Sequence, residues 1–127
     1  MIKKLYYKFI YSHYIDQFLN WFVWKFNNPY KLEMPCGWCP VQIEGNLLSG
    51  EYYYFRGRGN KWSIELYENE GDFFARTYLQ KRLFQYSEKF GETFEAGWML
   101  KREAIKFATL GIDKYYETKL FNAKDGL

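Results

Sequence analysis

The sequence predicts an α+β fold in which helices cover one face of a three-stranded antiparallel β-meander. Two observations lead to this prediction. Residues 36–68 contain three short runs in which apolar and polar side chains alternate, as they do in strands with one buried face. Residues 3–27 and 72–118 instead repeat apolar side chains at spacings of three and four, as helices do. Because a sheet with one apolar face needs a cover, we expect the N-terminal helix and two C-terminal helices to pack on that face.

The length and composition of the chain bound its organisation. With 127 residues and a mass of 15.5 kDa, residues 1–127 are expected to form a single domain around one core. Aromatic residues make up 24% of the chain, more than one small core holds, so some rings are expected to line a groove, an oligomer interface or a partner surface. The net charge of +3 is small and its charges are interspersed, which disfavours a dedicated nucleic-acid binder.

The N-terminal segment does not resemble a secretory signal or a spanning helix. Lys8, Ser12, His13 and Asp16 interrupt its apolar run, and no small-residue cleavage site follows. No segment of the chain approaches the roughly 18 uninterrupted apolar residues that mark a membrane span. We therefore expect a cytoplasmic protein.

Residues 3–27 are expected to form one helix that ends at the sequence NNP, because the residue before a proline is disfavoured in a helix. Its apolar residues at helical spacing are Ile15, Phe18, Leu19, Phe22 and Phe26. Rings occupy nearly every side of its first half, which indicates that it packs between two surfaces. A helix that lies on a membrane surface, with lysines flanking embedded rings, is the alternative.

The three expected strands share one apolar and one polar face. The apolar positions of the first and third strands are Val41, Ile43, Trp62, Ile64 and Leu66. The polar positions are Gln42, Glu44, Ser63, Glu65 and Tyr67. Trp62 is in phase with the apolar set and is expected at the centre of the core. The middle strand, YYYFR, allows either register, and we take Tyr53 and Phe55 to point inward.

Two helices are expected after the meander, over residues 72–118. The first begins at Asp72 as a helix cap and ends before Gly91, covering residues 72–90. The second covers residues 98–118, and Gly111 on its apolar side indicates close contact with a neighbouring element. Residues 119–127 are expected to form a frayed tail.

With this register, one polar sheet face becomes a candidate ligand-binding site. Its members are Gln42, Glu44, Tyr52, Tyr54, Arg56, Arg58 and Glu65. Two arginines can grip an anion with paired hydrogen bonds, and two tyrosines can stack a planar ring. The alternative is a stabilising pattern in which Arg56 and Arg58 pair with Glu44 and Glu65 across strands.

Other chemistry is weakly supported. Cys36 and Cys39 have the spacing of redox or zinc cysteines, but Pro40 and a strand follow them and the sequence has no second cysteine pair, so we expect two structural thiols. Redox activity and a metal site shared between molecules are the alternatives. His13, in a helix among aromatic residues, is expected to be structural. The common hydrolase, nucleotide-binding and metalloprotease motifs are missing. We therefore expect no catalytic residue, no metal and no cofactor.

Three segments carry a resemblance: CPVQIEG, YYYFRGRGNKWSIELY and WMLKREAIKFATLGIDKYYE. Together they resemble small uncharacterised proteins of bacterial and phage genomes, over residues 36–117. The resemblance implies a stand-alone accessory protein that acts by binding, and it transfers no catalytic residue.

These observations favour a small non-enzymatic binding module that recognises an anionic or planar small ligand on the polar sheet face. The alternative is a protein-interaction or inhibitor protein, such as a phage-encoded accessory or anti-defence factor, that uses the aromatic N-terminal helix. That role predicts a protein partner or a homo-oligomer. A third hypothesis is a small enzyme with Glu44 or Glu65 as its base, which requires a buried carboxylate beside a cavity.

Overall fold

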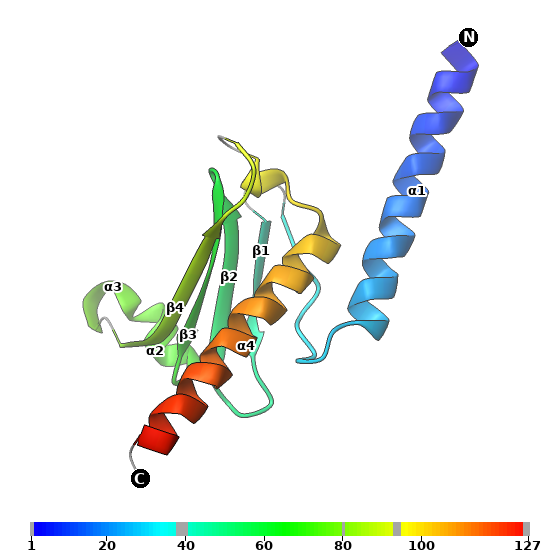
Figure 1. Ribbon diagram of the computed structural model, residues 1–127. Helices are drawn as coiled ribbons and strands as arrows, with labels where there is room; N and C mark the ends of the chain where they lie inside the picture. Colours follow the sequence, from blue (N-terminus) through cyan, green and yellow to red (C-terminus); the bar gives the residue numbers. More distant parts are fainter. Residues whose placement is uncertain (1, 38–40, 80, 93–94, 126–127) are drawn as a thin grey trace.

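The computed structural model describes residues 2–37, 41–79, 81–92 and 95–125 and has an α+β fold, as the sequence predicts (Figure 1). Its antiparallel sheet has the strand order β1-β2-β3-β4 and contains four strands, not three. The strands are β1 (Val41–Asn46), β2 (Tyr52–Arg58), β3 (Lys61–Tyr67) and β4 (Arg82–Lys89). The helices are α1 (Ile2–Phe26), α2 (Glu70–Phe74), α3 (Arg76–Leu79) and α4 (Lys101–Asp125), with a 3-10 turn η1 at Ala96–Trp98.

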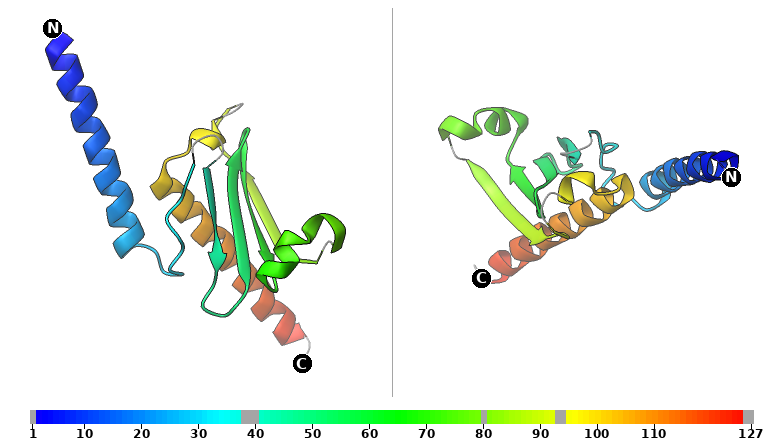
Figure 2. Two further views of the ribbon diagram at one scale, coloured as in Figure 1. Left: turned by 180° about the vertical axis from the view of Figure 1, so that it is seen from behind. Right: turned by 90° about the horizontal axis from the view of Figure 1, so that it is seen from above.

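The helices do not all lie on one face of the sheet, which corrects the predicted arrangement. Helix α4 alone crosses one face, and the short helices α2 and α3 lie on the opposite side (Figure 2). Helix α1 stands beside α4, away from the sheet, and its N-terminal part extends past the other elements (Figure 1). Among the described residues, no helix is long and apolar enough to cross a membrane.

The meander has the predicted register. Phe55 lies opposite both Ile43 and Ile64, and Gly57 lies opposite Val41 and Trp62. Directly opposed residues share a face of the sheet, so Tyr53 and Phe55 point toward α4 as expected. Phe55 is fully buried and Trp62 is 1% exposed, which confirms their place in the core.

The prediction of one helix over residues 72–90 is wrong. The chain makes two short helical turns and then forms the edge strand β4, in which Phe84 lies opposite Leu66 and Tyr86 opposite Ile64. These two rings alternate at a spacing of two and pack against the core, Tyr86 lying 5.7 Å from Trp62 between ring centroids. Pairing with the otherwise open backbone of β3 therefore prevails over the weaker helical spacing of the same segment.

Helix α4 provides the cover for the inner sheet face. Ala104, Ala108 and Ile112 are fully buried against the sheet. Gly111 makes the close contact that the sequence predicts, because a Cβ atom there would lie 2.4 Å from Cγ2 of Ile64. The helix continues to Asp125, so the expectation of a frayed tail from residue 119 is wrong over most of that segment.

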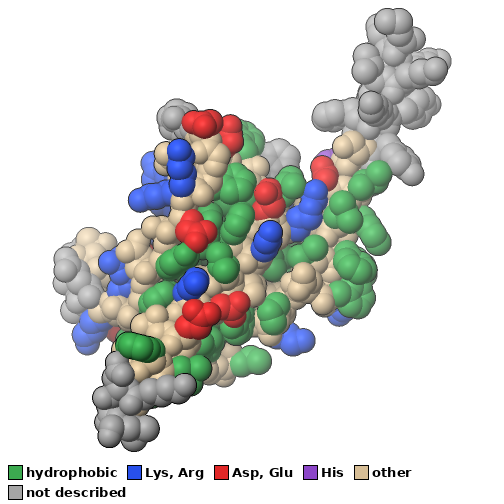
Figure 3. All heavy atoms as spheres, in the orientation of Figure 1, with side chains coloured by type: hydrophobic (Ala, Val, Ile, Leu, Met, Phe, Trp, Pro, Cys, Tyr) green, Lys and Arg blue, Asp and Glu red, His purple; other side chains and the backbone are tan. Residues whose placement is uncertain are grey.

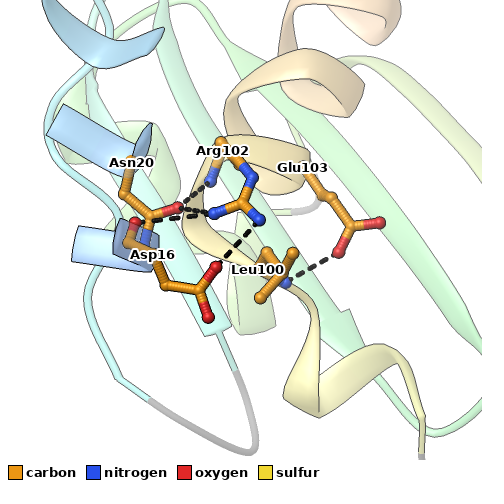
Figure 4. A network of polar contacts seen from close by, with 5 residues as sticks. All are labelled: Asp16, Asn20, Leu100, Arg102 and Glu103. Carbon is orange, nitrogen blue, oxygen red and sulfur yellow. Dashed lines mark hydrogen bonds and ion pairs between the residues drawn. The ribbon is translucent and has the colours of Figure 1, made fainter. Parts of the chain in front are cut away.

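The prediction that the first half of α1 packs between two surfaces falls largely on residues 2–11, whose side chains lie outside the described part; Tyr14, which is described, is 65% exposed. Helix α1 contacts α4 through a polar network, in which Arg102 binds the Asp16 carboxylate and the Asn20 side chain at 3.1 Å each (Figure 4). The helix end is held by Trp24, whose indole N–H donates to the carbonyl of Leu32 at 2.9 Å. The opposite side of the helix is exposed.

Candidate functional site

The residues of the predicted site all lie on the sheet face that points away from α4. We call this the outer face. Directly opposed residues of β1, β2 and β3 form rows across this face. One row is Gln42, Arg56 and Ser63, and the next is Glu44, Tyr54 and Glu65. Strand β4 extends these rows with Gln85 and Ser87, and its first residue, Arg82, lies opposite Tyr67. Arg58 is exposed at the end of β2, opposite Lys61.

The tyrosines of the outer face are covered by Phe73 of α2. The Phe73 ring centroid lies 4.9 Å from that of Tyr52, 5.0 Å from Tyr54 and 5.5 Å from Tyr67. Tyr52 is 5% exposed and Tyr67 is 2% exposed. The aromatic platform expected for a planar ligand is thus already occupied by a ring of the chain itself.

Helix α2 is set over the face by a local cap. Asn69, not the expected Asp72, is the cap residue, and its side-chain oxygen accepts a hydrogen bond of 2.8 Å from the Asp72 backbone N–H. Phe73 then becomes the buried residue of this short helix, while the next residue, Phe74, is 67% exposed.

A pocket of about 560 Å³ opens beside the covered tyrosines. Its lining comes from three elements: Glu65 and Tyr67 of β3, Arg76 and Thr77 of α3, and Arg82 of β4. The Arg76 guanidinium lies 4.1 Å from the centroid of the Phe73 ring, and it donates to the Phe73 carbonyl at 2.9 Å. This stacking and hydrogen bond orient one arginine at the pocket wall.

Glu65 organises the β3 side of this pocket. Its two carboxylate oxygens accept separate hydrogen bonds, one of 2.6 Å from the Tyr67 hydroxyl and one of 3.3 Å from Arg82. Burial, followed by the hydrogen bond to Glu65, raises the pKa of Tyr67 above its usual range, so this hydroxyl stays a donor. Glu65 therefore holds Arg82 in place at the pocket wall.

Glu44 is engaged elsewhere on the face. It is exposed and accepts a hydrogen bond of 3.1 Å from the Tyr52 hydroxyl. Burial, followed by the charge of Glu44, raises the pKa of Tyr52 to about 12. The pairs expected between Glu44 or Glu65 and Arg56 or Arg58 do not form: Glu44 binds Tyr52, and Glu65 binds Tyr67 and Arg82.

Arg56 is the unusual group of the outer face. Its Nε atom is buried and has no hydrogen-bond partner among the described residues. The side chains opposite it, Gln42 and Ser63, are neutral, and within the same part of the chain Arg56 takes part in no ion pair. A buried donor without a partner costs about 1–3 kcal/mol, more when it is charged.

The remaining candidates for chemistry lie apart from this face. Cys36 is exposed, and its backbone exchanges two hydrogen bonds of 2.9 Å with Gln42; Cys39 lies outside the described residues. His13 is exposed on α1, with its Nε2 atom 3.0 Å from the Gln17 side-chain nitrogen. Where side chains are described, no three His, Cys, Asp or Glu residues are grouped so that they could hold a metal ion.

Sequence reasoning missed Arg76, Thr77 and Arg82. All three belong to the segment that was expected to form a single helix. That prediction gave no reason to place them at the outer face. The one available signal was the spacing of two between Phe84 and Tyr86, which indicates a strand and places its first residue, Arg82, at the sheet.

Comparisons with protein-family models, with curated proteins and with solved structures find no match to this chain. What the outer face can do chemically follows from its own groups. Arg56, Arg76 and Arg82 offer planar, permanently charged donors, and the carboxylates of Glu44 and Glu65 offset two of the three charges.

Proposed function

We propose that the protein is a non-enzymatic binding module that takes up a small anion at the outer face of its sheet. The observation that carries this proposal is the buried Nε atom of Arg56, a donor that has no partner among the described residues. A carboxylate or phosphate group would satisfy this donor and neutralise its charge, because the fork of an arginine matches the oxygens of both anions.

The pocket that Glu65 shares with Arg76 and Arg82 is the second part of the proposed site, and Arg56 is not among its lining residues. Arg56 lies opposite Ser63, and Glu65 follows Ser63 by two residues on the same face. Diagonal neighbours of this kind are about 7–8 Å apart, so one small molecule can touch Arg56 and the pocket wall together. Because Arg56, Arg76 and Arg82 outnumber Glu44 and Glu65 on this face, an anionic ligand is favoured over a neutral one. Planar stacking is not part of the proposal, since Phe73 covers the tyrosines.

The test is an NMR titration with defined anions, namely inorganic phosphate, pyrophosphate and citrate. The Nε–H signal of Arg56 is expected to shift on binding, and Arg56→Gln is expected to weaken binding about tenfold to a hundredfold, the range for one lost charge-assisted hydrogen bond. Arg58→Gln is the matched control, because Arg58 lies on the same strand but is exposed at its end. It is expected to change affinity less than about twofold.

Two results would contradict the proposal. One is an equal loss of affinity in Arg56→Gln and Arg58→Gln, which would indicate non-specific attraction by positive charge. The other is a large loss of stability in Arg56→Gln, because removal of a buried donor without a partner is expected to leave the free energy of unfolding unchanged or to raise it by about 1–3 kcal/mol. Native mass spectrometry of the protein purified from its own host is a separate test: the proposal predicts an added mass that is absent in Arg56→Gln.

A further inference from the structure

Helix α1 presents a wide apolar face to solvent. This apolar face consists of Tyr14, Ile15, Phe18, Leu19, Trp21, Phe22 and Phe26, which are all exposed. Phe18 is 59% exposed and Phe26 is 65% exposed. Figure 3 shows hydrophobic side chains gathered along the described part of this helix, at the edge of the molecule. Contiguous exposed apolar surface of this kind marks a site of interaction.

The orientation of the helix is fixed by its polar side. Asp16 and Asn20 turn toward α4 and bind Arg102 (Figure 4). Phe18 and Phe22 each follow one of these residues by two positions, about 200° around the helix axis. The contacts that anchor α1 therefore hold its aromatic rings on the side away from the sheet.

The charge of the chain is concentrated on the same helix. Residues 2–26 contain four lysines and one aspartate, which together account for the whole net charge of +3, because the other residues carry fourteen basic and fourteen acidic side chains. The single aspartate, Asp16, is already paired with Arg102. A partner of this helix is therefore expected to be negatively charged.

We propose that α1 lies flat in the surface of an anionic phospholipid bilayer, with its apolar face embedded among the lipids. Lysines flank this apolar face in sequence, three of them at residues 3–8 and one at Lys25, and a helix that lies on a membrane gains affinity from both apolar burial and charge. Lys25 lies between the rings of Trp21 and Phe26 in sequence and is exposed, so it can extend along the apolar surface to the headgroups.

The rest of the molecule leaves this approach open. Seen from above, the sheet and α4 lie on one side of α1, and α2 and α3 lie farther away (Figure 2). A flat surface can thus meet the apolar face without touching the sheet. The outer face with its proposed anion site points away from α4 and lies apart from the apolar face of α1.

A second copy of the chain fits this helix less well than a bilayer does. It would bring the same four lysines to the contact, and like charges repel. Paired helices also favour Ile, Val and Leu at the contact positions, whereas the large rings of Phe18, Phe22 and Phe26 occupy them here. A fluid lipid surface accommodates such rings without a matching set of holes.

The test is co-sedimentation of the full chain with vesicles of phosphatidylcholine alone or mixed with phosphatidylglycerol. Binding is expected only with the anionic vesicles, and it is expected to weaken as salt rises from about 0.1 M to about 1 M, which shortens the Debye length from about 10 Å to about 3 Å. The double variant Phe18→Ser/Phe22→Ser is expected to lower the partition coefficient about a hundredfold, because two rings no longer enter the lipid.

The matched control is Phe74→Ser, which removes a ring of α2 that is at least as exposed as Phe18 and Phe22 and is expected to leave binding unchanged. Circular dichroism and thermal unfolding are expected to be the same for all variants, because these side chains are exposed. Absence of binding to anionic vesicles would overturn the proposal, as would equal binding to neutral ones. A concentration-dependent dimer that the double variant abolishes would overturn it too, and would assign the apolar face to a second copy.

Discussion

Arg102 of α4 joins the two long helices of the protein through Asp16 and Asn20 of α1. Its guanidinium donates to the Asp16 carboxylate and to the Asn20 side-chain oxygen at 3.1 Å each, and its backbone N–H donates to the same Asn20 oxygen at 3.2 Å. The backbone N–H groups of the first turn of a helix have no partner within that helix. Helix α1 therefore supplies a cap for α4 (Figure 4).

This relationship predicts that Arg102→Met releases α1 from α4. The variant loses two side-chain contacts that involve a charged group, and the free energy of unfolding is expected to fall by about 1–2 kcal/mol. Hydrogen exchange is expected to accelerate over residues 12–26 while the sheet keeps its protection. Lys101→Met is the control, because Lys101 precedes Arg102 and takes part in no ion pair within the described residues. Equal exchange in both variants would show that the network does not hold α1.

A second prediction concerns the neighbouring rings of α2. Phe73→Ala is expected to lower the free energy of unfolding by about 3–5 kcal/mol, because it leaves a cavity over three tyrosines. Phe74→Ala is expected to change it by less than about 0.5 kcal/mol, because Phe74 is 67% exposed. Urea denaturation of the two variants measures the difference. Similar values for both would mean that α2 does not pack on the outer face as described.

The parts of the fold that the sequence predicts are those with a strong local pattern. Val41, Ile43, Trp62 and Ile64 alternate with polar residues over whole strands, and this period places the outer-face residues correctly once Tyr53 is taken inward. The sequence of β4 has no such unambiguous pattern, because Tyr86 fits both a helical and a strand spacing of apolar residues. Only its pairing with β3, a contact distant in sequence, decides between them.

The arrangement of the helices depends on similarly distant contacts. The spacing of apolar residues predicts α1 but not which side faces the protein, because that is set by Arg102, more than eighty positions away. Likewise, the cover over the tyrosines requires Phe73 to meet residues of β2 and β3. Local sequence patterns contain no information on either contact. The sequence therefore predicted that the tyrosines of the outer face are open to a ligand, whereas Phe73 covers them.

A third prediction tests the contact between α4 and the sheet. A Cβ atom at Gly111 would lie 2.4 Å from Cγ2 of Ile64 and 3.6 Å from the Trp62 ring, and Ile64 is fully buried. Gly111→Ala is therefore expected to destabilise the protein by about 1–3 kcal/mol through overpacking, despite the better helix propensity of alanine.

The matched test is a double-mutant cycle with Ile64→Ala, which removes the atom that the new methyl group meets. The double variant is expected to be more stable than the sum of the two single effects predicts, with a coupling of about 0.5–3 kcal/mol. Additive effects in urea denaturation would contradict a direct contact between these residues.

The fourth prediction concerns alkaline pH and Tyr53. This residue is fully buried, its hydroxyl accepts a hydrogen bond of 2.8 Å from the Glu33 backbone N–H, and burial raises its pKa to about 12. An unfolded tyrosine titrates near pH 10, so between about pH 10 and pH 12 the unfolded chain releases a proton that the folded protein retains. The stabilisation is complete below about pH 10 and is lost as the pH rises toward 12, with a limiting slope of about 1.4 kcal/mol per pH unit for this proton.

Tyr53→Phe removes that proton, so its stability is expected to fall less steeply over the same pH range than that of the wild-type protein. Tyr52 and Tyr115, whose pKa values burial also raises to about 12, still contribute a downward slope in the variant. Urea denaturation at a series of pH values compares the two slopes. Because the comparison uses slopes, it is independent of the constant cost of leaving the Glu33 N–H without its acceptor. Parallel curves would show that the Tyr53 hydroxyl ionises as readily in the folded protein as in the unfolded chain.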